Sequence, residues 1–283
     1  MTSQPGGDHS DATVVALETI NVNRERIAMM SSPSLAAVAA LTALLGVSTV
    51  QPAPAAEKTV VLVHGAFADG SSWSKVIPLL QAKGVKVVAV QNPLSSLAAD
   101  VDATKRVIDA QSGPVILVGH SYGGVVITQA GVNPKVAALV YVAAFAPPNG
   151  QSVNGLGKGQ PPPAWAASIK ADSGGYLSLT PDGVAKFFAQ DLPPKEAAIL
   201  AATQGPTFAG AFDDKVTETA YTAKPTWYVV AKKDRMIAPE AEMAMAKAAN
   251  AKITTLETSH VAMLSKPKEV ATVILAAAAA VKE

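Results

Sequence analysis

The chain has 283 residues, of which 49% are hydrophobic and 16% are charged, so it is long enough for one domain with a large core. It contains no cysteine, which excludes disulfides, cysteine-ligated zinc and a thiol nucleophile. The formal net charge of +1 gives no reason to expect binding to nucleic acid or to an anionic membrane surface.

Residues 1–56 have the pattern of a leader. An uncharged apolar run over residues 35–47 follows Arg24 and Arg26, and small residues up to Ala56 offer a cleavage site. The run is shorter than the roughly 20 residues that span a bilayer. We therefore expect a cleaved secretory signal and an exported protein, periplasmic or secreted, without stable membrane insertion. A buried helix and a membrane anchor are the alternatives.

From Glu57 onward, short apolar runs alternate with helical patterns. The runs are rich in β-branched residues and nearly continuous, which is typical of parallel strands buried on both faces. They cover residues 59–63, 85–90, 115–118, 136–142, 226–230 and 252–256. Strands that alternate with helices predict a doubly wound, mostly parallel α/β sheet over residues 57–283.

The helices between these runs have recognisable ends. Ser72 is predicted to cap a helix over residues 73–83, which contains a proline that should kink it. Apolar residues at helical spacing over 97–108 predict the next helix. Pro239 begins a helix whose first turn is acidic, as the helix dipole favours, and Pro267 begins the last one.

The segment from about 147 to 224 breaks this alternation, since it contains no convincing core strand. A segment of this length is too long for a plain loop in a compact domain. We expect a helical cap insertion over one end of the sheet. Its aromatic residues Trp165, Phe187 and Phe188 are candidates for binding an apolar substrate, although aromatic residues also serve simply as packing.

The strongest chemical signal is G-x-S-x-G at residues 119–123, centred on Ser121. A buried strand precedes it and a helical pattern follows it. This context is that of a nucleophile elbow, a sharp strand-to-helix turn that exposes the serine hydroxyl. The alternative is a glycine-rich turn of a nucleotide-binding unit, and the order of the partner residues along the chain favours the nucleophile elbow.

A serine hydroxyl needs a base to act as a nucleophile at neutral pH. His260 follows a predicted strand and precedes the last helix, at the carboxyl edge of the sheet. Asp234 follows the preceding strand, so the chain order is Ser, Asp, His, as in α/β-hydrolases. Asp213 and Asp214 are weaker candidates for the acid because no strand precedes them.

An ester hydrolase also needs two backbone donors for the oxyanion of the tetrahedral intermediate. The N–H of Tyr122, directly after the serine, is one candidate. The second is expected from the loop after the first strand, from Ala66 or Phe67. No group of His, Asp and Glu has the spacing of metal ligands, so neither a metal nor a cofactor is expected.

Four stretches of this sequence resemble one subfamily of α/β-hydrolases, the plant methylesterases and hydroxynitrile lyases with their bacterial esterase relatives. They are LVHGAFADGSSW, GHSYGG, the D-x-x-I-x-P-E stretch at 234–240, and SHVAMLSKP. The resemblance covers residues 57–283. It implies a catalytic triad of Ser121, Asp234 and His260, and a small apolar pocket under a helical cap.

Two positions separate members of this subfamily. The lyases carry a lysine directly after the catalytic histidine and a threonine in the first oxyanion loop, whereas this chain has Val261 and Gly65. The resemblance therefore implies a serine esterase that cleaves esters of small, largely apolar molecules through an acyl-enzyme on Ser121. Lyase-like carbon–carbon cleavage on the same triad and a non-catalytic small-molecule receptor are the alternatives.

Overall fold

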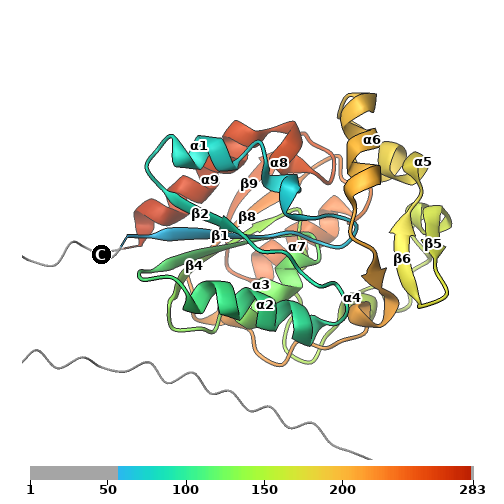
Figure 1. The fold of residues 1–283 in the computed structure, drawn as a ribbon. Coiled ribbons are helices and arrows are strands. Elements are labelled where there is room, and N and C mark those ends of the chain that lie inside the picture. The colour runs from blue at the N-terminus through green and yellow to red at the C-terminus, as the bar shows by residue number, and fades with distance from the viewer. Residues whose placement is uncertain (1–56, 282–283) are drawn as a thin grey trace, which may run out of the picture. The chain divides into compact units, whose positions relative to one another are not determined.

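The computed structural model describes residues 57–281, so the predicted leader and its signal lie outside the described residues. Six strands form one parallel sheet in the order β2-β1-β3-β4-β8-β9 (Figure 1). Their bounds are Thr59–Val63 (β1), Lys86–Ala89 (β2), Val115–His120 (β3), Val136–Val142 (β4), Thr226–Ala231 (β8) and Lys252–Leu256 (β9). All six predicted strands are present, with ends that differ by at most two residues, and the predicted α/β sheet is confirmed.

Helices cover both faces of this sheet, because parallel neighbours must be joined by long crossover connections. Helices α1 and α9 pack together on one face, and α2 and α3 pack together on the other (Figure 1). The helices around the sheet are α1 (Ile77–Gln81), α2 (Leu97–Asp109), α3 (Gly123–Ala130), α7 (Pro239–Ala248), α8 (Ala262–Ser265) and α9 (Pro267–Ala280). The helices predicted at Pro239 and Pro267 begin at those residues.

The helix predicted over residues 73–83 is divided in two. A short 3₁₀ turn, η1 (Gly70–Trp73), is capped by the side chain of Asp69, and α1 follows after a break. The predicted cap at Ser72 was therefore wrong. Pro78 lies in the first turn of α1. The N–H groups of a first turn have no acceptor within the helix, so a proline fits there without breaking a hydrogen bond. The predicted kink in a longer helix is therefore absent.

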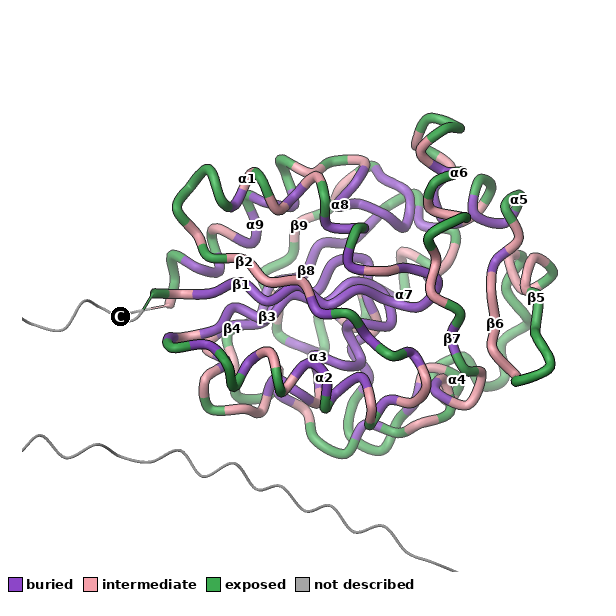
Figure 2. Tube along the Cα trace, viewed as in Figure 1, coloured by how far each residue is buried: buried purple, intermediate pink, exposed green. Residues whose placement is uncertain are grey.

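The core lies in the middle strands of the sheet. Every residue of β1, β3 and β8 is buried, whereas the edge strand β9 is exposed or half-buried throughout. Figure 2 shows the central strands in purple and the edges in pink and green. Burial of apolar side chains on both faces makes this sheet a rigid platform, and the loops at its carboxyl edge carry the candidate site.

Residues 147–224 form a cap beyond the carboxyl ends of the strands (Figure 1). The cap contains helices, as predicted, and also a three-stranded antiparallel sheet in the order β5-β6-β7, which we did not predict. Its elements are α4 (Val153–Leu156), η2 (Ala164–Ser168), β5 (Ile169–Ala171), β6 (Tyr176–Leu179), α5 (Pro181–Gly183), η3 (Val184–Phe188), α6 (Pro194–Thr203), β7 (Thr207–Phe208), η4 (Ala209–Phe212) and η5 (Ala220–Thr222). These strands have two to four residues, too few for a readable alternation of apolar and polar positions.

Hydrogen bonds join the cap to loops on two sides of the sheet. On one side the N–H of Phe208 donates to the carbonyl of Leu94 at 2.8 Å. On the other side the amide of Gln190 donates to the carbonyl of Lys233 at 2.6 Å, directly before the predicted catalytic acid. The cap thus contacts loops on both sides of the candidate nucleophile.

Candidate active site

Ser121 occupies a sharp turn between β3 and α3. Its φ angle is +53°, in the left-handed region that non-glycine residues seldom adopt. A Cβ atom at Gly119 would lie 2.6 Å from the carbonyl oxygen of Gly123, and one at Gly123 would lie 2.6 Å from that of Val63. Both flanking glycines are therefore required by close packing, as the nucleophile elbow demands.

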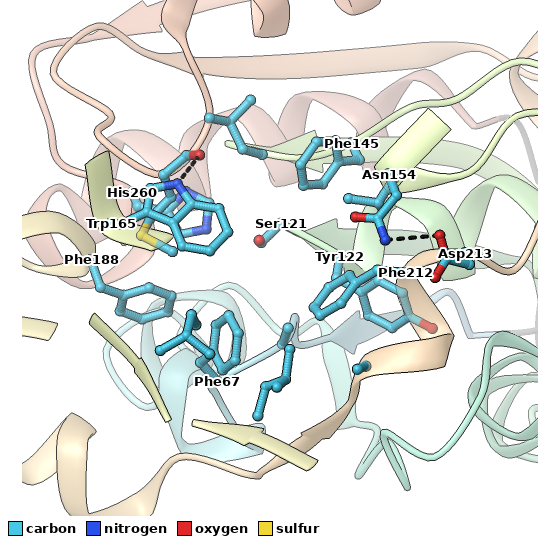
Figure 3. A pocket seen from close by; sticks show the side chains of 17 residues that line it. Phe67, Ser121, Tyr122, Phe145, Asn154, Trp165, Phe188, Phe212, Asp213 and His260 are labelled. Atoms are coloured by element: carbon cyan, nitrogen blue, oxygen red, sulfur yellow. Dashed lines mark hydrogen bonds between the residues drawn. The ribbon is translucent and has the colours of Figure 1, made fainter. Parts of the chain in front are cut away.

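His260 and Asp234 form a buried pair. The His260 Nδ1 lies 2.6 Å from Asp234 Oδ2, and the other carboxylate oxygen accepts the N–H groups of Met236 at 2.6 Å and Ile237 at 3.0 Å. With Nδ1–H donating to the carboxylate, the lone pair of the imidazole is on Nε2. His260 and Ser121 line the same cavity, so the structure brings the three predicted triad residues together (Figure 3).

The two alternative acids lie elsewhere. Asp213 Oδ1 accepts the amide N–H of Asn154, and Asp214 Oδ2 accepts the N–H of Leu97 at the start of α2. Neither is bonded to His260. Asp234 is therefore the carboxylate that orients the imidazole.

The loop after β1 is packed directly against the elbow. A Cβ at Gly65 would lie only 2.7 Å from the Cβ of Ser121 and 3.1 Å from the nitrogen of Tyr122. Within the described residues, no hydrogen bond occupies the N–H of Ala66 or of Tyr122, whereas the N–H of Phe67 donates to Thr207 Oγ1 at 3.4 Å. Of the two residues expected to supply the second donor, Ala66 has the free N–H.

Two buried histidines hold these loops in place, and sequence reasoning assigned a role to neither. His64 Nδ1 donates to the Gly65 carbonyl, and His64 Nε2 accepts the N–H of Asn92, each at 2.9 Å. His120 Nε2 donates to the carbonyl of His260 at 3.0 Å. Burial lowers the pKa of both rings, so each is neutral and has one donor and one acceptor nitrogen. Their position in the sequence could have indicated this role, because each lies at the carboxyl end of a buried strand, next to the site.

A second carboxyl group lies near the acid. Glu242 on α7 is fully buried, and its Oε2 accepts the N–H of Ala231 at 3.0 Å. Burial, and then the charge of Asp234, raise the pKa of the Glu242 carboxyl well above its usual value, which favours its protonated form. The helix dipole favours acidic residues in the first turn of α7, as the sequence predicts, but Glu242 in that turn is also fully buried.

The cavity above Ser121 has a volume of about 250 Å³ and is mainly apolar. The predicted cap residues Trp165 and Phe188 line it, and the ring of Phe188 lies 5.1 Å from that of His260. Phe187 is not among the residues that line the cavity. The two phenylalanines are adjacent in a single π-helical turn, which directs consecutive side chains to different sides.

Within residues 57–281, no three His, Asp or Glu side chains lie close enough together to hold a metal ion. No helix in this part of the chain is both long and apolar enough to cross a membrane.

Residues 60–273 match the family described as the alpha/beta hydrolase family, and the chain belongs to this family. It is 29% identical to Methylesterase 2 of Arabidopsis thaliana over 77% of this chain and 95% of the relative. Polyneuridine aldehyde esterase is similar in structure, with a TM-score of 0.69 and 21% identity, over 78% of this chain and 98% of that one. A pyrethroid hydrolase from Sphingobium faniae JZ-2 has a TM-score of 0.67 and 23% identity, over 79% of this chain and 98% of that one. The resemblance to the methylesterase-like subfamily is confirmed.

Proposed function

We propose that this protein is a carboxylic ester hydrolase that cleaves esters of small, largely apolar molecules through an acyl-enzyme on Ser121. The observation that carries this proposal is the buried 2.6 Å contact between Asp234 and His260, together with the position of His260 in the cavity that Ser121 also lines. The methylesterase relative and the family support ester hydrolysis in general.

In the proposed mechanism, His260 Nε2 accepts the proton of Ser121 Oγ as that oxygen attacks the ester carbonyl. The free N–H groups of Tyr122 and Ala66 stabilise the negative charge on the carbonyl oxygen, and each such donor contributes roughly 2.7–4 kcal/mol. His260 then gives the proton to the departing alkoxide, which leaves as the alcohol. Water, activated by the same imidazole, hydrolyses the acyl-enzyme and regenerates Ser121. Asp234 stabilises the imidazolium formed in both steps.

Cyanohydrin cleavage on the same triad is the main alternative, and two observations disfavour it. Departing cyanide would be stabilised by a nearby cation, but Val261 is fully buried and no lysine or arginine is among the residues that line the cavity. The threonine that the lyases carry in the first oxyanion loop would also not fit here, because a Cβ at position 65 would lie 2.7 Å from the Cβ of Ser121. A non-catalytic receptor would not require the oriented triad, so this role is disfavoured as well.

The proposal is tested with purified protein and short-chain aryl esters, with aromatic cyanohydrins as the comparison. We expect ester hydrolysis, no cyanide release above background, and a covalent adduct on Ser121 after treatment with a fluorophosphonate, detected by mass spectrometry. Ser121→Ala should remove both turnover and adduct. Cyanide release without hydrolysis of any ester would replace the esterase assignment with the lyase.

We also propose that the protein is exported, on the basis of the apolar run at 35–47 and the small residues up to Ala56. Protein recovered from outside the cytoplasm should begin near Ala56 or Glu57 when its N-terminus is sequenced. Exported protein that retains residues 30–50 would contradict cleavage of the leader.

A further inference from the structure

The cavity has an unusual distribution of charge. Among the 17 residues that line it, Asp213 is the only carboxylate, and no lysine or arginine is present. The amide nitrogen of Asn154 donates to Asp213 Oδ1 at 2.9 Å. Figure 3 shows this pair on the opposite side of Ser121 from Trp165 and Phe188, with the aromatic rings of Tyr122 and Phe212 beside it. The remaining side chains there are apolar or aromatic, so this pair is a polar end of an apolar cavity.

Two separate parts of the cap supply this pair and are bonded to each other. Asn154 belongs to α4, and Asp213 directly follows η4. Reciprocal backbone hydrogen bonds join these segments nearby: the N–H of Gly150 donates to the carbonyl of Val216 at 2.8 Å, and the N–H of Val216 donates to the carbonyl of Gln151 at 2.9 Å. The position of the pair is therefore set by the backbone and not by the side chains alone.

The pair offers acceptors to a ligand. Within the described residues, no hydrogen bond uses Asn154 Oδ1 or Asp213 Oδ2, and no lysine or arginine forms a salt bridge with Asp213. In Figure 3 the amide oxygen of Asn154 points to the Ser121 side of the cavity. An ionised carboxylate accepts hydrogen bonds and cannot donate them. A group that binds to these two oxygens must therefore donate hydrogen bonds, and a positive charge adds attraction to Asp213.

We propose that Asn154 and Asp213 form a subsite that selects aromatic esters whose end remote from the scissile bond carries an ammonium or hydroxyl group, and that rejects esters with a free carboxylate there. As a statement about substrates, this inference rests on the proposed esterase function. The aromatic rings of Tyr122 and Phe212 pack edge to face, with their centroids 5.7 Å apart, and both residues line the cavity, so an aromatic portion of the substrate can pack against them.

Binding of ligands that contain no ester tests the subsite without turnover. Calorimetry on the wild-type protein at low, constant ionic strength would compare 2-phenylethylammonium with 3-phenylpropanoate. We expect the cation to bind about five- to tenfold more tightly, which is the size of the effect of one partly exposed charge. In Asp213→Asn this ratio should fall to within about twofold. Asp182→Asn is the matched control, because Asp182 is an exposed cap aspartate paired with Lys186 outside the cavity, and its ratio should stay at the wild-type value.

Equal affinity for the two ligands, or a preference that persists in Asp213→Asn, would overturn the subsite. The same comparison with matched aryl esters should give the same order of kcat/KM. A protein that binds the ligands in the expected order but hydrolyses no ester would disprove the proposed esterase function while supporting the subsite. Hydrolysis of all the esters at equal rates, together with equal binding, would support the esterase and reject the subsite.

Discussion

The central sheet and the cap differ in how they are held together. Every residue of β3 is buried, whereas in the cap strand β6 only Leu179 is. The sheet is stabilised mainly by the burial of apolar side chains. Ser121, Asp234 and His260 lie in the loops that follow the carboxyl ends of β3, β8 and β9. The cap packs fewer apolar residues and contacts the catalytic loops through hydrogen bonds, such as the one that the N–H of Ser259 donates to Asp191 Oδ2 at 2.8 Å. From this difference we expect the sheet to position the catalytic residues and the cap to determine which substrate binds.

The largest effect should come from the triad itself. In Asp234→Asn the amide can no longer hold His260 in the tautomer that leaves Nε2 free as a base, and we expect kcat to fall about 10⁴-fold for every ester. Steady-state kinetics on several esters would check this. If the fall differed strongly between esters, the chemistry and the substrate choice would not be separate functions of sheet and cap.

A core substitution should affect stability far more than a cap substitution. Leu117 on β3 is fully buried, so Leu117→Ala should lower the free energy of unfolding by about 2–5 kcal/mol. Ile199 on the cap helix α6 is 61% exposed, and Ile199→Ala should change the free energy of unfolding by less than about 0.5 kcal/mol. Urea unfolding of both variants measures the difference. Equal losses would mean that the cap contributes to the core as much as the sheet does.

The buried carboxyl of Glu242 predicts a pH-dependent difference. Because its pKa is higher in the folded than in the unfolded protein, its stabilising effect is complete at low pH and is lost as the pH rises toward the folded pKa. Glu242→Gln keeps a carbonyl acceptor for the N–H of Ala231 but cannot titrate. The variant should therefore gain stability relative to the wild type by up to about 1.4 kcal/mol for each pH unit above about 4.5.

Thermal unfolding of both proteins at pH 5 and pH 7 would test this. A difference in Tm that does not depend on pH would show that Glu242 is not protonated in the folded state. Ester turnover at pH 7 in the variant would report whether the carboxyl also supports Asp234.

The smallest effect is expected where the cap contacts the triad. Trp165 lines the cavity, and its indole N–H donates to the carbonyl of Met236 at 2.9 Å, next to the residues that hold Asp234. Trp165→Phe removes this donor and should lower kcat/KM about three- to tenfold, to a degree that depends on the ester. The control is Trp227→Phe on β8, which is outside the cavity and should leave kcat/KM unchanged. An equal loss for all esters would assign Trp165 to the chemistry and not to substrate choice.

The sequence alone was sufficient for the sheet and the triad because both depend on local patterns. Continuous β-branched runs predict buried parallel strands, and a nucleophile, an acid and a histidine that each follow a strand lie at the same edge of such a sheet. The glycines around Ser121 were readable for the same reason, since the turn between β3 and α3 leaves no room for a Cβ atom.

Only the tertiary structure decided what depends on contacts between distant segments. The choice of Ala66 over Phe67 rests on Thr207, which is 140 residues away in the chain and engages the N–H of Phe67. Phe187 and Phe188 have the same residue type and adjacent positions, so no local pattern could say which one faces the cavity. The raised pKa of Glu242 likewise follows from its complete burial near Asp234, because desolvation depends on everything packed around the carboxyl and not on the residues beside it in the chain.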